Sequence, residues 1–419
     1  MALTFKCQEL AYAAESSFSE NAESPTSNTW DARIPFLSSP TVTLTQDRIR
    51  DTGLRARMNE ESLSHPGARE ASLEFTAYWC GHLTTAAGAL TQTWQQDLLS
   101  DGLGGGNVAA VGTVISGAAS STTSLNVTAG TNFVAGGVTR VGVKGDGRGD
   151  GAPLAIASMT DATPDVLALL TAAPAAPTTA GDVVYACQMA FPDESTSATL
   201  GTKRFLVSHT TSGAQYHLMG GQLSGLTFDI SNGQLPRLTF RYRFAYWARG
   251  ADTTPSARVI KDHFCAPVAG GSMFINNVGT TTRTTITPAS IRFNVNVGLE
   301  PIVGPGGAGT FQFITGWQRT MAKADLSMDI PWAVANGETF WDQANQSYTY
   351  KHILFGANHT DGRAVGFYLP KVFSVGERPS RPSEVNGQDY VTVNYTCTDG
   401  PTTDGSTELI KSNFRLFAG

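Results

Sequence analysis

Charged residues are scarce in this chain of 419 amino acids, at 15% of the sequence, where about a quarter is usual. Neither sign dominates, because 29 Lys and Arg stand against 35 Asp and Glu, which gives a net charge of -6. A protein that grips nucleic acid is typically basic, so the charge balance argues against that class. Gly, Thr, Ser and Ala are plentiful instead, and this favours a β-rich chain with much buried surface.

Cysteines are few, far apart and odd in number, and no CxxC pair occurs. This pattern predicts reduced thiols in a cytosolic product rather than disulfides or a metal centre. The N-terminal stretch MALTFKCQELAYAAESSFSE has no basic region before an apolar run, so we expect no secretory signal. No apolar run is long enough to predict a transmembrane helix. The five cysteines are Cys7, Cys80, Cys187, Cys265 and Cys397.

Catalytic and cofactor motifs are missing as well. The sequence contains no GxSxG, HExxH or P-loop, and no GxGxxG between a strand and a helix. Its seven histidines have no ligand spacing, which is typical of surface or interface positions. The stretch GDGRGDG offers Asp146 and Asp150, but calcium requires six to eight oxygen ligands, so we interpret it as a plain loop. The sequence therefore predicts no catalytic, cofactor-binding or metal-binding residue.

Two strand patterns stand out among the segments that are present. In REASLEFTAYW, residues 69–79, apolar and polar side chains alternate with the period of two that indicates a half-buried strand. AKADLSMDIPW, residues 322–332, repeats this order position by position. Ala71 corresponds to Ala324 and Trp79 to Trp332, since 324 - 71 and 332 - 79 both give 253. We interpret the match as an internal repeat.

The neighbours of these two strands also correspond. Each is preceded by an alternating strand, at 41–45 and 290–297, and then by a long loop, at 51–68 and 299–318. Loops of that length usually have a task or are disordered. Downstream, the spacing of Leu90, Trp94 and Leu98 predicts a helix that ends at the glycines of 102–106, and a short helix is expected at 338–346. Each unit closes with a hairpin, at 216–247 and 366–398.

The sequence thus predicts a mainly β, or β-rich α+β, chain with two tandem β-barrel or sandwich domains, each with a flanking helix. Residues 108–199 resemble a small β module, with a short helical run PDVLALLT, placed in a loop of the first domain. Loop insertions cost little closure entropy, so the module should fold without disturbing its host. The expected boundaries are an N-terminal arm at 1–33, a first domain at 34–107 and 200–255, the module, a linker at 256–284, and a second domain at 285–419.

The stretch RLTFRYRFAYWAR interleaves basic and aromatic residues, as nucleic-acid stacking surfaces do. Its aromatic residues share one face with Leu238 and are better explained as core, which places Arg241 and Arg243 on the other face. These arginines are expected to meet carboxylates of a neighbour rather than phosphate.

Several segments together resemble the tail tube proteins, or major tail proteins, of bacteriophages with long, non-contractile tails. The resemblance begins in ELAYAAESSFSENAESPTSNTWDARIPFLSSPTVTLTQDRIRDTGLRAR and HPGAREASLEF, and extends to GRAVGFYLPKVFSVGERPSRPSEVNGQDYVTVNYT. Ala71 and Ser72 stand where the family often has a glycine. Members of this family form rings of six domains that stack into a hollow tube for the genome, and a chain with a doubled domain needs three copies per ring.

The resemblance implies a virion protein that is assembled in the host cytoplasm, with no cofactor, no enzymatic activity and no membrane contact. Its partners would be further copies of itself, a tape measure protein, tail terminator and tip proteins, and double-stranded DNA that passes without specific binding. It also implies that the long loops contact the next subunit or ring, and that a polar strand face lines the lumen. The candidate loop residues are Arg55, Arg57, Glu60, Glu61, Pro301, Phe311 and Phe313, and the candidate lumen residues are Glu70, Ser72, Glu74, Thr76, Lys323, Asp325, Ser327 and Asp329.

Two other classes remain open at this point. The module and the Gly/Thr-rich strands also suit another virion structural protein, such as a decoration or capsid-associated protein. An enzyme or a carbohydrate-binding module is the third alternative.

Overall fold

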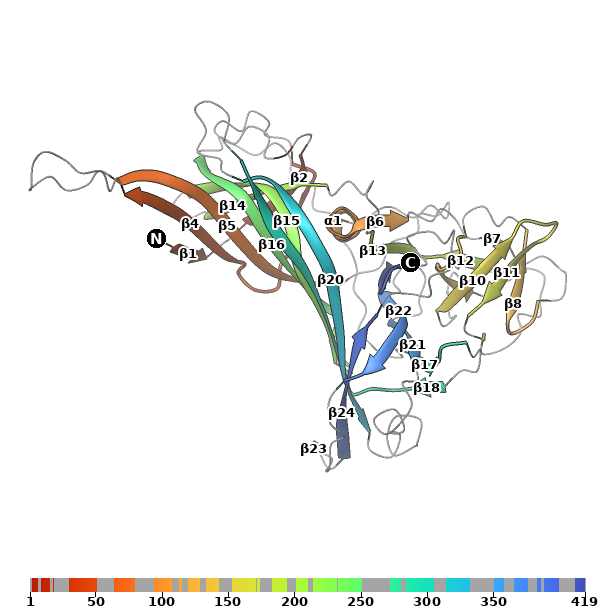
Figure 1. Cartoon of the computed structure of the whole chain (residues 1–419). Coiled ribbons are helices and arrows are strands. Elements are labelled where there is room, and N and C mark those ends of the chain that lie inside the picture. The colour runs from red at the N-terminus through yellow and green to blue at the C-terminus, as the bar shows by residue number, and fades with distance from the viewer. Residues whose placement is uncertain are drawn as a thin grey trace, which may run out of the picture.

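The computed structural model is that of a mainly β protein, as expected (Figure 1). Nineteen of the described strands join one hydrogen-bonded network, and six others form a separate sheet. The structure describes residues 2–6, 9–15, 18, 30–50, 64–79, 94–107, 113–114, 120–128, 133–142, 153–170, 172–173, 183–193, 201–209, 214–231, 233–250, 272–279, 284–304, 314–331, 350–357, 365–375, 383–385, 388–398 and 411–418.

Long strands of the first unit form the upper part of the large sheet in Figure 1. Their antiparallel order is β4-β5-β16-β15, and β15 then pairs through its first half with β14, which is followed by β2 and β3. The bounds are β2 Glu9–Ala14, β3 Ala32–Arg33, β4 Thr41–Arg50, β5 Ser64–Tyr78, β14 Lys203–His209, β15 Ala214–Ser231 and β16 Arg237–Gly250.

The second unit repeats this order strand for strand, as β19-β20-β24-β22-β21-β17-β18. A short strand, β23, extends the β22 side of β24. The bounds are β17 Ser272–Asn277, β18 Thr284–Ile286, β19 Ser290–Val303, β20 Ile314–Pro331, β21 Lys351–Ala357, β22 Val365–Ser374, β23 Ser383–Val385 and β24 Gln388–Cys397.

The registers agree with the offset of 253 that the sequence predicts. Leu73 of β5 lies opposite Tyr242, and Leu326 of β20, 253 residues later, lies opposite Tyr395. Both tyrosines are buried, and burial raises the pKa of each. The register shift of the β4–β5 pair begins at Gln46 and that of the β19–β20 pair at the corresponding Val297. The two units therefore share pairing, core positions and irregularities.

The repeat also extends into segments that the sequence assigned elsewhere. Strand β2 lies within the expected arm at 1–33, yet it pairs with β14, and Leu10, Ala11 and Tyr12 are fully buried. Its counterpart β17 lies within the expected linker at 256–284. Each unit thus includes a strand that precedes the boundary drawn from the sequence.

One hydrophobic core spans both units. Alternation explains it, because every second residue of the long strands points to the same side. Phe75 stacks on Phe240 at 5.0 Å between ring centroids in the first unit. Phe367 of the second unit contacts Phe293 at 5.1 Å and Phe228 of the first unit at 5.8 Å. The two units therefore share one hydrophobic core rather than folding as two separate domains.

Both long hairpins continue as strands into regions expected to be loops. Residues 299–303 pair with 314–319, and 48–50 pair with 64–66. The parts of the expected loops at 51–63 and 305–313 lie outside the described residues. So do Leu90 and the predicted helix at 338–346.

Helix α1, Trp94–Leu103, confirms the predicted helix, which includes Gly102 and ends within the glycine-rich stretch 102–106. Gly104 follows with a φ of +84°, a backbone conformation that residues other than glycine rarely adopt. The chain then forms β6, Gly104–Asn107, which pairs with β13, Gln188–Pro192, and β13 in turn pairs with β25, Arg415–Ala418.

The six-stranded sheet lies between β6 and β13 in sequence and forms the right-hand lobe in Figure 1. Asn107 of β6 lies opposite Met189 of β13, so the module leaves and rejoins its host at neighbouring positions. Strand β13 itself belongs to the large sheet, which ends the module's own sheet at β12. Its strands are β7 Thr113–Val114, β8 Ser124–Val127, β9 Val138–Gly142, β10 Leu154–Thr160, β11 Asp165–Leu169 and β12 Val183–Ala186.

The expected short helix PDVLALLT is wrong, because this segment is strand β11. Leu167 and Leu169 are buried and alternate with half-buried neighbours, and the strand pairs with both β8 and β10. A short apolar run carries no period long enough to distinguish a helix from a buried strand, so tertiary pairing decides.

The module shares a hydrophobic cluster with the second unit. Val138 and Ala155 pack in one cluster with Leu354 and Tyr368. Arg415, almost fully buried, donates from Nη1 to the Gly136 carbonyl at 2.6 Å. The module is thus packed against the second unit as well as inserted into the first.

Candidate self-assembly interface

The long sheet has one polar face, formed by the alternate residues of β4, β5, β16, β15, β19, β20 and β24 that point away from the core. The structure brings all eight candidate lumen residues onto this face, since their strand neighbours Leu73, Phe75, Ala324 and Leu326 are buried. Within residues 70–76, 227–229, 237–243, 290–296 and 323–329, this face carries five acidic residues, Glu70, Glu74, Asp229, Asp325 and Asp329, and five basic ones, Arg237, Arg241, Arg243, Arg292 and Lys323.

Charges on the polar face are matched across neighbouring strands. Arg243 lies 3.7 Å from Glu70, and Arg292 lies 3.5 Å from Asp229. Arg241 lies opposite Glu74 in the β16–β5 register. Arg243 therefore meets a carboxylate, as expected, but one of the same chain, whereas Arg241 donates to Thr227. Exposed pairs of this kind contribute only about 0 to 1 kcal/mol each, so their main effect is to neutralise the face.

Hydroxyl groups tie the acidic residues of the second unit to the sheet. Ser290 Oγ donates to Asp329 at 2.5 Å, and Thr392 Oγ1 donates to the same carboxylate at 2.7 Å. Thr396 Oγ1 donates to Asp325 at 2.7 Å. These hydrogen bonds tie the carboxylates of β20 to the neighbouring strands β19 and β24.

The two units meet edge to edge in what we call the β15–β19 junction. Gly225–Ser231 of β15 pair with Ser290–Asn296 of β19, which makes the sheet continuous across the repeat. Thr227 Oγ1 donates to Asn294 Oδ1 at 3.0 Å, and Arg241 Nη2 donates to the same hydroxyl at 3.2 Å. The backbone ladder, this polar chain and the shared core together fix how one unit follows the other.

The extended end of the second hairpin, which we call the β19–β20 arm (299–303 and 314–319), leans on the first unit. Trp317 Nε1 donates to the Gly220 carbonyl at 2.8 Å, and the Arg243 guanidinium lies 5.0 Å from the Trp317 ring centroid. Arg319 donates to the carbonyls of Leu103 and Asp193. Pro301, a candidate loop residue, is exposed in this arm opposite Trp317. The other six candidate loop residues lie outside the described residues.

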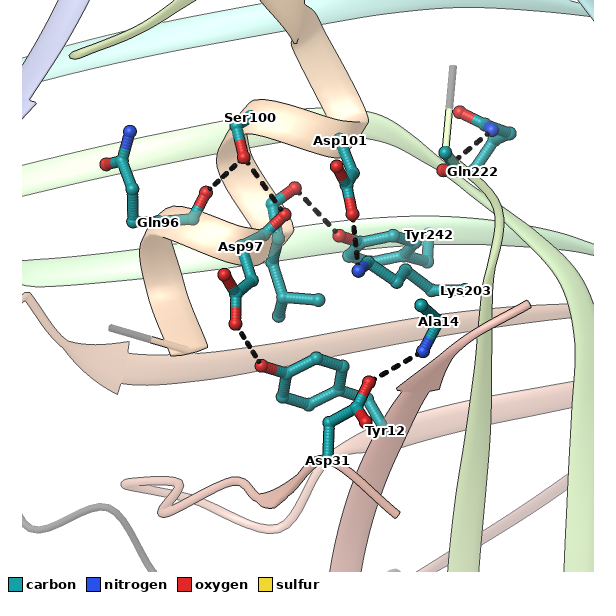
Figure 2. A network of polar contacts seen from close by, with 12 residues as sticks. Tyr12, Ala14, Asp31, Gln96, Asp97, Ser100, Asp101, Lys203, Gln222 and Tyr242 are labelled. Carbon is teal, nitrogen blue, oxygen red and sulfur yellow. Dashed lines mark hydrogen bonds and ion pairs between the residues drawn. The ribbon is translucent and has the colours of Figure 1, made fainter. Parts of the chain in front are cut away.

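Within the first unit, a polar network, shown in Figure 2, joins α1 to β2, β14 and β16. Tyr12 Oη donates to Asp97 at 2.9 Å, and burial followed by the nearby Asp97 charge raises the pKa of this tyrosine far above its ordinary value. Lys203 is buried, pairs with Asp101 of α1, and has its ammonium 5.6 Å from the Tyr12 ring. Tyr242 Oη donates to the Leu98 carbonyl at 3.3 Å. The Tyr12, Lys203 and Tyr242 side chains of this network are buried, so the network packs the helix against the strands rather than forming an open site.

Reasoning from sequence missed three residues, Thr227, Asn294 and Lys203. Thr227 and Asn294 read as ordinary strand residues, and nothing in the sequence tells which strands meet. Lys203 was not singled out, although KRFLVSH and KHILFGA, the two counterpart strands, both begin with a lysine that proves to be buried. That shared start is a sequence signal that could have extended the repeat.

The described residues contain no group of three or more His, Cys, Asp or Glu side chains that could hold a metal ion. In the same part of the chain, no helix is long and apolar enough to cross a membrane. Comparison with protein-family models finds no match to this chain, and comparison with curated proteins finds no significant match either.

Proposed function

We propose that this chain is a structural subunit that assembles with copies of itself into stacked rings, which form the tail tube of a bacteriophage. The β15–β19 junction carries this proposal. It joins two units of the same strand order edge to edge, so the same contact between chains would add units in the same direction. A contact of this head-to-tail kind closes into a ring when its rotation divides a full turn.

The two outer edges needed for such a contact can be identified from the repeat. Strand β4 is the counterpart of β19, and the segment around β22 and β23 is the counterpart of β15. In a ring, β4 of one chain would pair with the β23 segment of the next. Main-chain pairing at a sheet edge is a common way to bind another chain.

The arm contacts support the same arrangement. Because the β19–β20 arm packs on the preceding unit, its counterpart at 48–50 and 64–66 would pack on the preceding chain. The loop at 51–63, with Arg55, Arg57, Glu60 and Glu61, would extend from that arm toward the next subunit or ring.

The neutral polar face suits a lumen for DNA. Duplex DNA carries one negative charge per about 1.7 Å of its axis, and a basic wall would hold it through released counterions. A face whose five arginine and lysine residues are matched by five carboxylates lets the genome pass. In the virion, the tape measure protein and the terminator and tip proteins would be the further partners.

Disulfide trapping tests the edge contact at one register. Asp229 pairs with Arg292 across the junction. Thr41 is the counterpart of Arg292, because their partners Glu74 and Ser327 differ by 253. Ser383 pairs with Tyr390, which pairs with Pro331, and Asp229 pairs with Arg237, which pairs with Tyr78. Because 331 - 78 also gives 253, Ser383 is the counterpart of Asp229.

Mixing the single variants Thr41→Cys and Ser383→Cys should therefore give a covalent dimer under mild oxidation, whereas neither variant alone should. Electron microscopy of the assembled wild type should show three chains per ring with pseudo-sixfold symmetry. Rings of six full-length chains, or a protein that stays monomeric at every concentration, would contradict the proposal.

A further inference from the structure

The outer edge of β4 is already occupied within the chain. Strand β1, Ala2–Lys6, pairs antiparallel with it, from Ala2 opposite Thr45 to Lys6 opposite Thr41 (Figure 1). The other edge of β4 is filled by β5. A strand has only two edges, so no further strand can pair with these five residues while β1 is in place.

The repeat identifies what this edge corresponds to in the second unit. The counterpart edge of β19 is bound by β15 of the first unit, over seven residue pairs from 290 to 296. Thr41 and Thr45 correspond to Arg292 and Asn296, so β1 lies where the equivalent segment of another copy would pair. The β1–β4 ladder has five pairs and is thus shorter than the β15–β19 ladder.

From this overlap we propose that β1 is a removable edge cap: it covers the β4 edge in the free chain and leaves it when the β23 segment of a second copy binds. The inference rests on the proposed self-assembly. Unpaired edges invite uncontrolled pairing with other chains, and covering them is a known way to prevent it. A covalently attached strand competes well in the free chain because its effective concentration is high.

The exchange is energetically possible because both states satisfy the same backbone groups of β4. The incoming copy would offer a ladder of seven pairs, the arm contacts and the apolar contact seen between the units, whereas β1 offers a ladder of five pairs. The cap therefore delays assembly without preventing it.

A disulfide across β1 and β4 tests the cap in the full-length chain. Thr4 lies opposite Thr43, and directly opposed residues of antiparallel strands have Cα atoms about 4.5 to 5.5 Å apart, within the range of a disulfide. The variant Thr4→Cys/Thr43→Cys should stay unassembled when oxidised and form tubes after reduction. The control Thr76→Cys/Thr239→Cys bridges β5 and β16, a pair that persists in the ring, and should assemble in both states.

A chain without residues 2–6 provides the opposite perturbation. Its lag before tube formation, followed by light scattering, should shorten by about tenfold, since one or two net hydrogen bonds are enough to change the exposure of the edge by that factor. Hydrogen exchange should show faster exchange of the β4 amides in this free variant than in the wild type.

The outcomes separate this inference from the proposed function. If the oxidised Thr4→Cys/Thr43→Cys chain forms tubes at the wild-type rate, β1 stays on β4 in the tube and the cap is refuted, while the tube subunit stands. If neither the wild type nor the variant lacking residues 2–6 assembles, the proposed function fails, and the cap fails with it.

Discussion

The ion pair between Lys203 and Asp101 should be the most sensitive point of the network in Figure 2. The Lys203 side chain is 5% exposed, whereas that of Asp101 is 41% exposed. Removing one partner of a fully buried pair costs about 3 to 5 kcal/mol, because the other charge is left without compensation. Water can reach the site of Asp101, so we expect Asp101→Ala to lower the free energy of unfolding by about 2 to 3 kcal/mol.

The reverse substitution should cost less. Lys203→Met keeps the apolar stem in the core and leaves Asp101 in contact with water, so the expected loss is about 1 kcal/mol or less. The double variant should resemble Lys203→Met alone, which gives a coupling energy of about 2 kcal/mol in a double-mutant cycle. As a control for an exposed pair, Asp229→Ala, which removes the partner of Arg292, should cost less than about 1 kcal/mol.

Urea unfolding of the unassembled chain measures these differences, and hydrogen exchange of α1 amides locates them. A cost of Asp101→Ala no larger than that of Asp229→Ala would refute the reasoning, because Lys203 would then have adequate solvent or another partner. Additive effects in the cycle would do the same.

Three further predictions concern pH, the loop and the module. Burial lowers the pKa of His352 from 6.5 to about 4, so folding disfavours protonation of this side chain. The free energy of unfolding should keep its full value above pH 6.5 and fall by about 3 kcal/mol as the pH drops toward 4. His352→Leu should flatten this part of a profile of unfolding free energy against pH. Arg55→Glu/Arg57→Glu should leave the melting temperature of the free chain nearly unchanged but shorten or abolish tubes in electron micrographs, and tubes of normal length would exclude the loop as an assembly contact. Replacing residues 110–186 by a Gly/Ser linker should preserve the β6–β13 pairing but uncover the cluster beneath the module and remove the acceptor of Arg415, so a lower melting temperature and dye binding to exposed apolar surface are expected.

The main features of the fold can be predicted from sequence where one side of a strand is buried and the other is not. In β5 and β20 the alternation is strict, because a shift by one residue would exchange the two faces. The same property placed the candidate lumen residues on one face. It also separated the aromatic residues around Tyr242 from Arg241 and Arg243, although the carboxylate partner of Arg243 belongs to the same chain and Arg241 donates to Thr227.

Other features depend on contacts that no local pattern contains. Strand β11 was expected to be a helix because five apolar residues fit either period, and only pairing with β8 and β10 decides between them. Strands β2 and β17 were placed in an arm and a linker because Tyr12 and Ile275 share no identity, and only their common register with β14 and β21 reveals the repeat. The burial of Lys203 follows from α1 crossing above it, which the sequence cannot specify.

Under the proposed function, the position of β1 follows from what a duplicated tube domain would require. In a single-domain subunit every contact around a ring is between chains, so every edge must stay unpaired until assembly. Here half of these contacts are made inside the chain, where β15 fills the β19 edge as soon as the chain folds. Under the proposed function, the β4 edge and the β23 segment that would bind it are the two edges that must wait for a second copy, and β1 lies on the first of them. Duplication thus limits the open edges to this one pair, and a five-residue extension is enough to cover the β4 side.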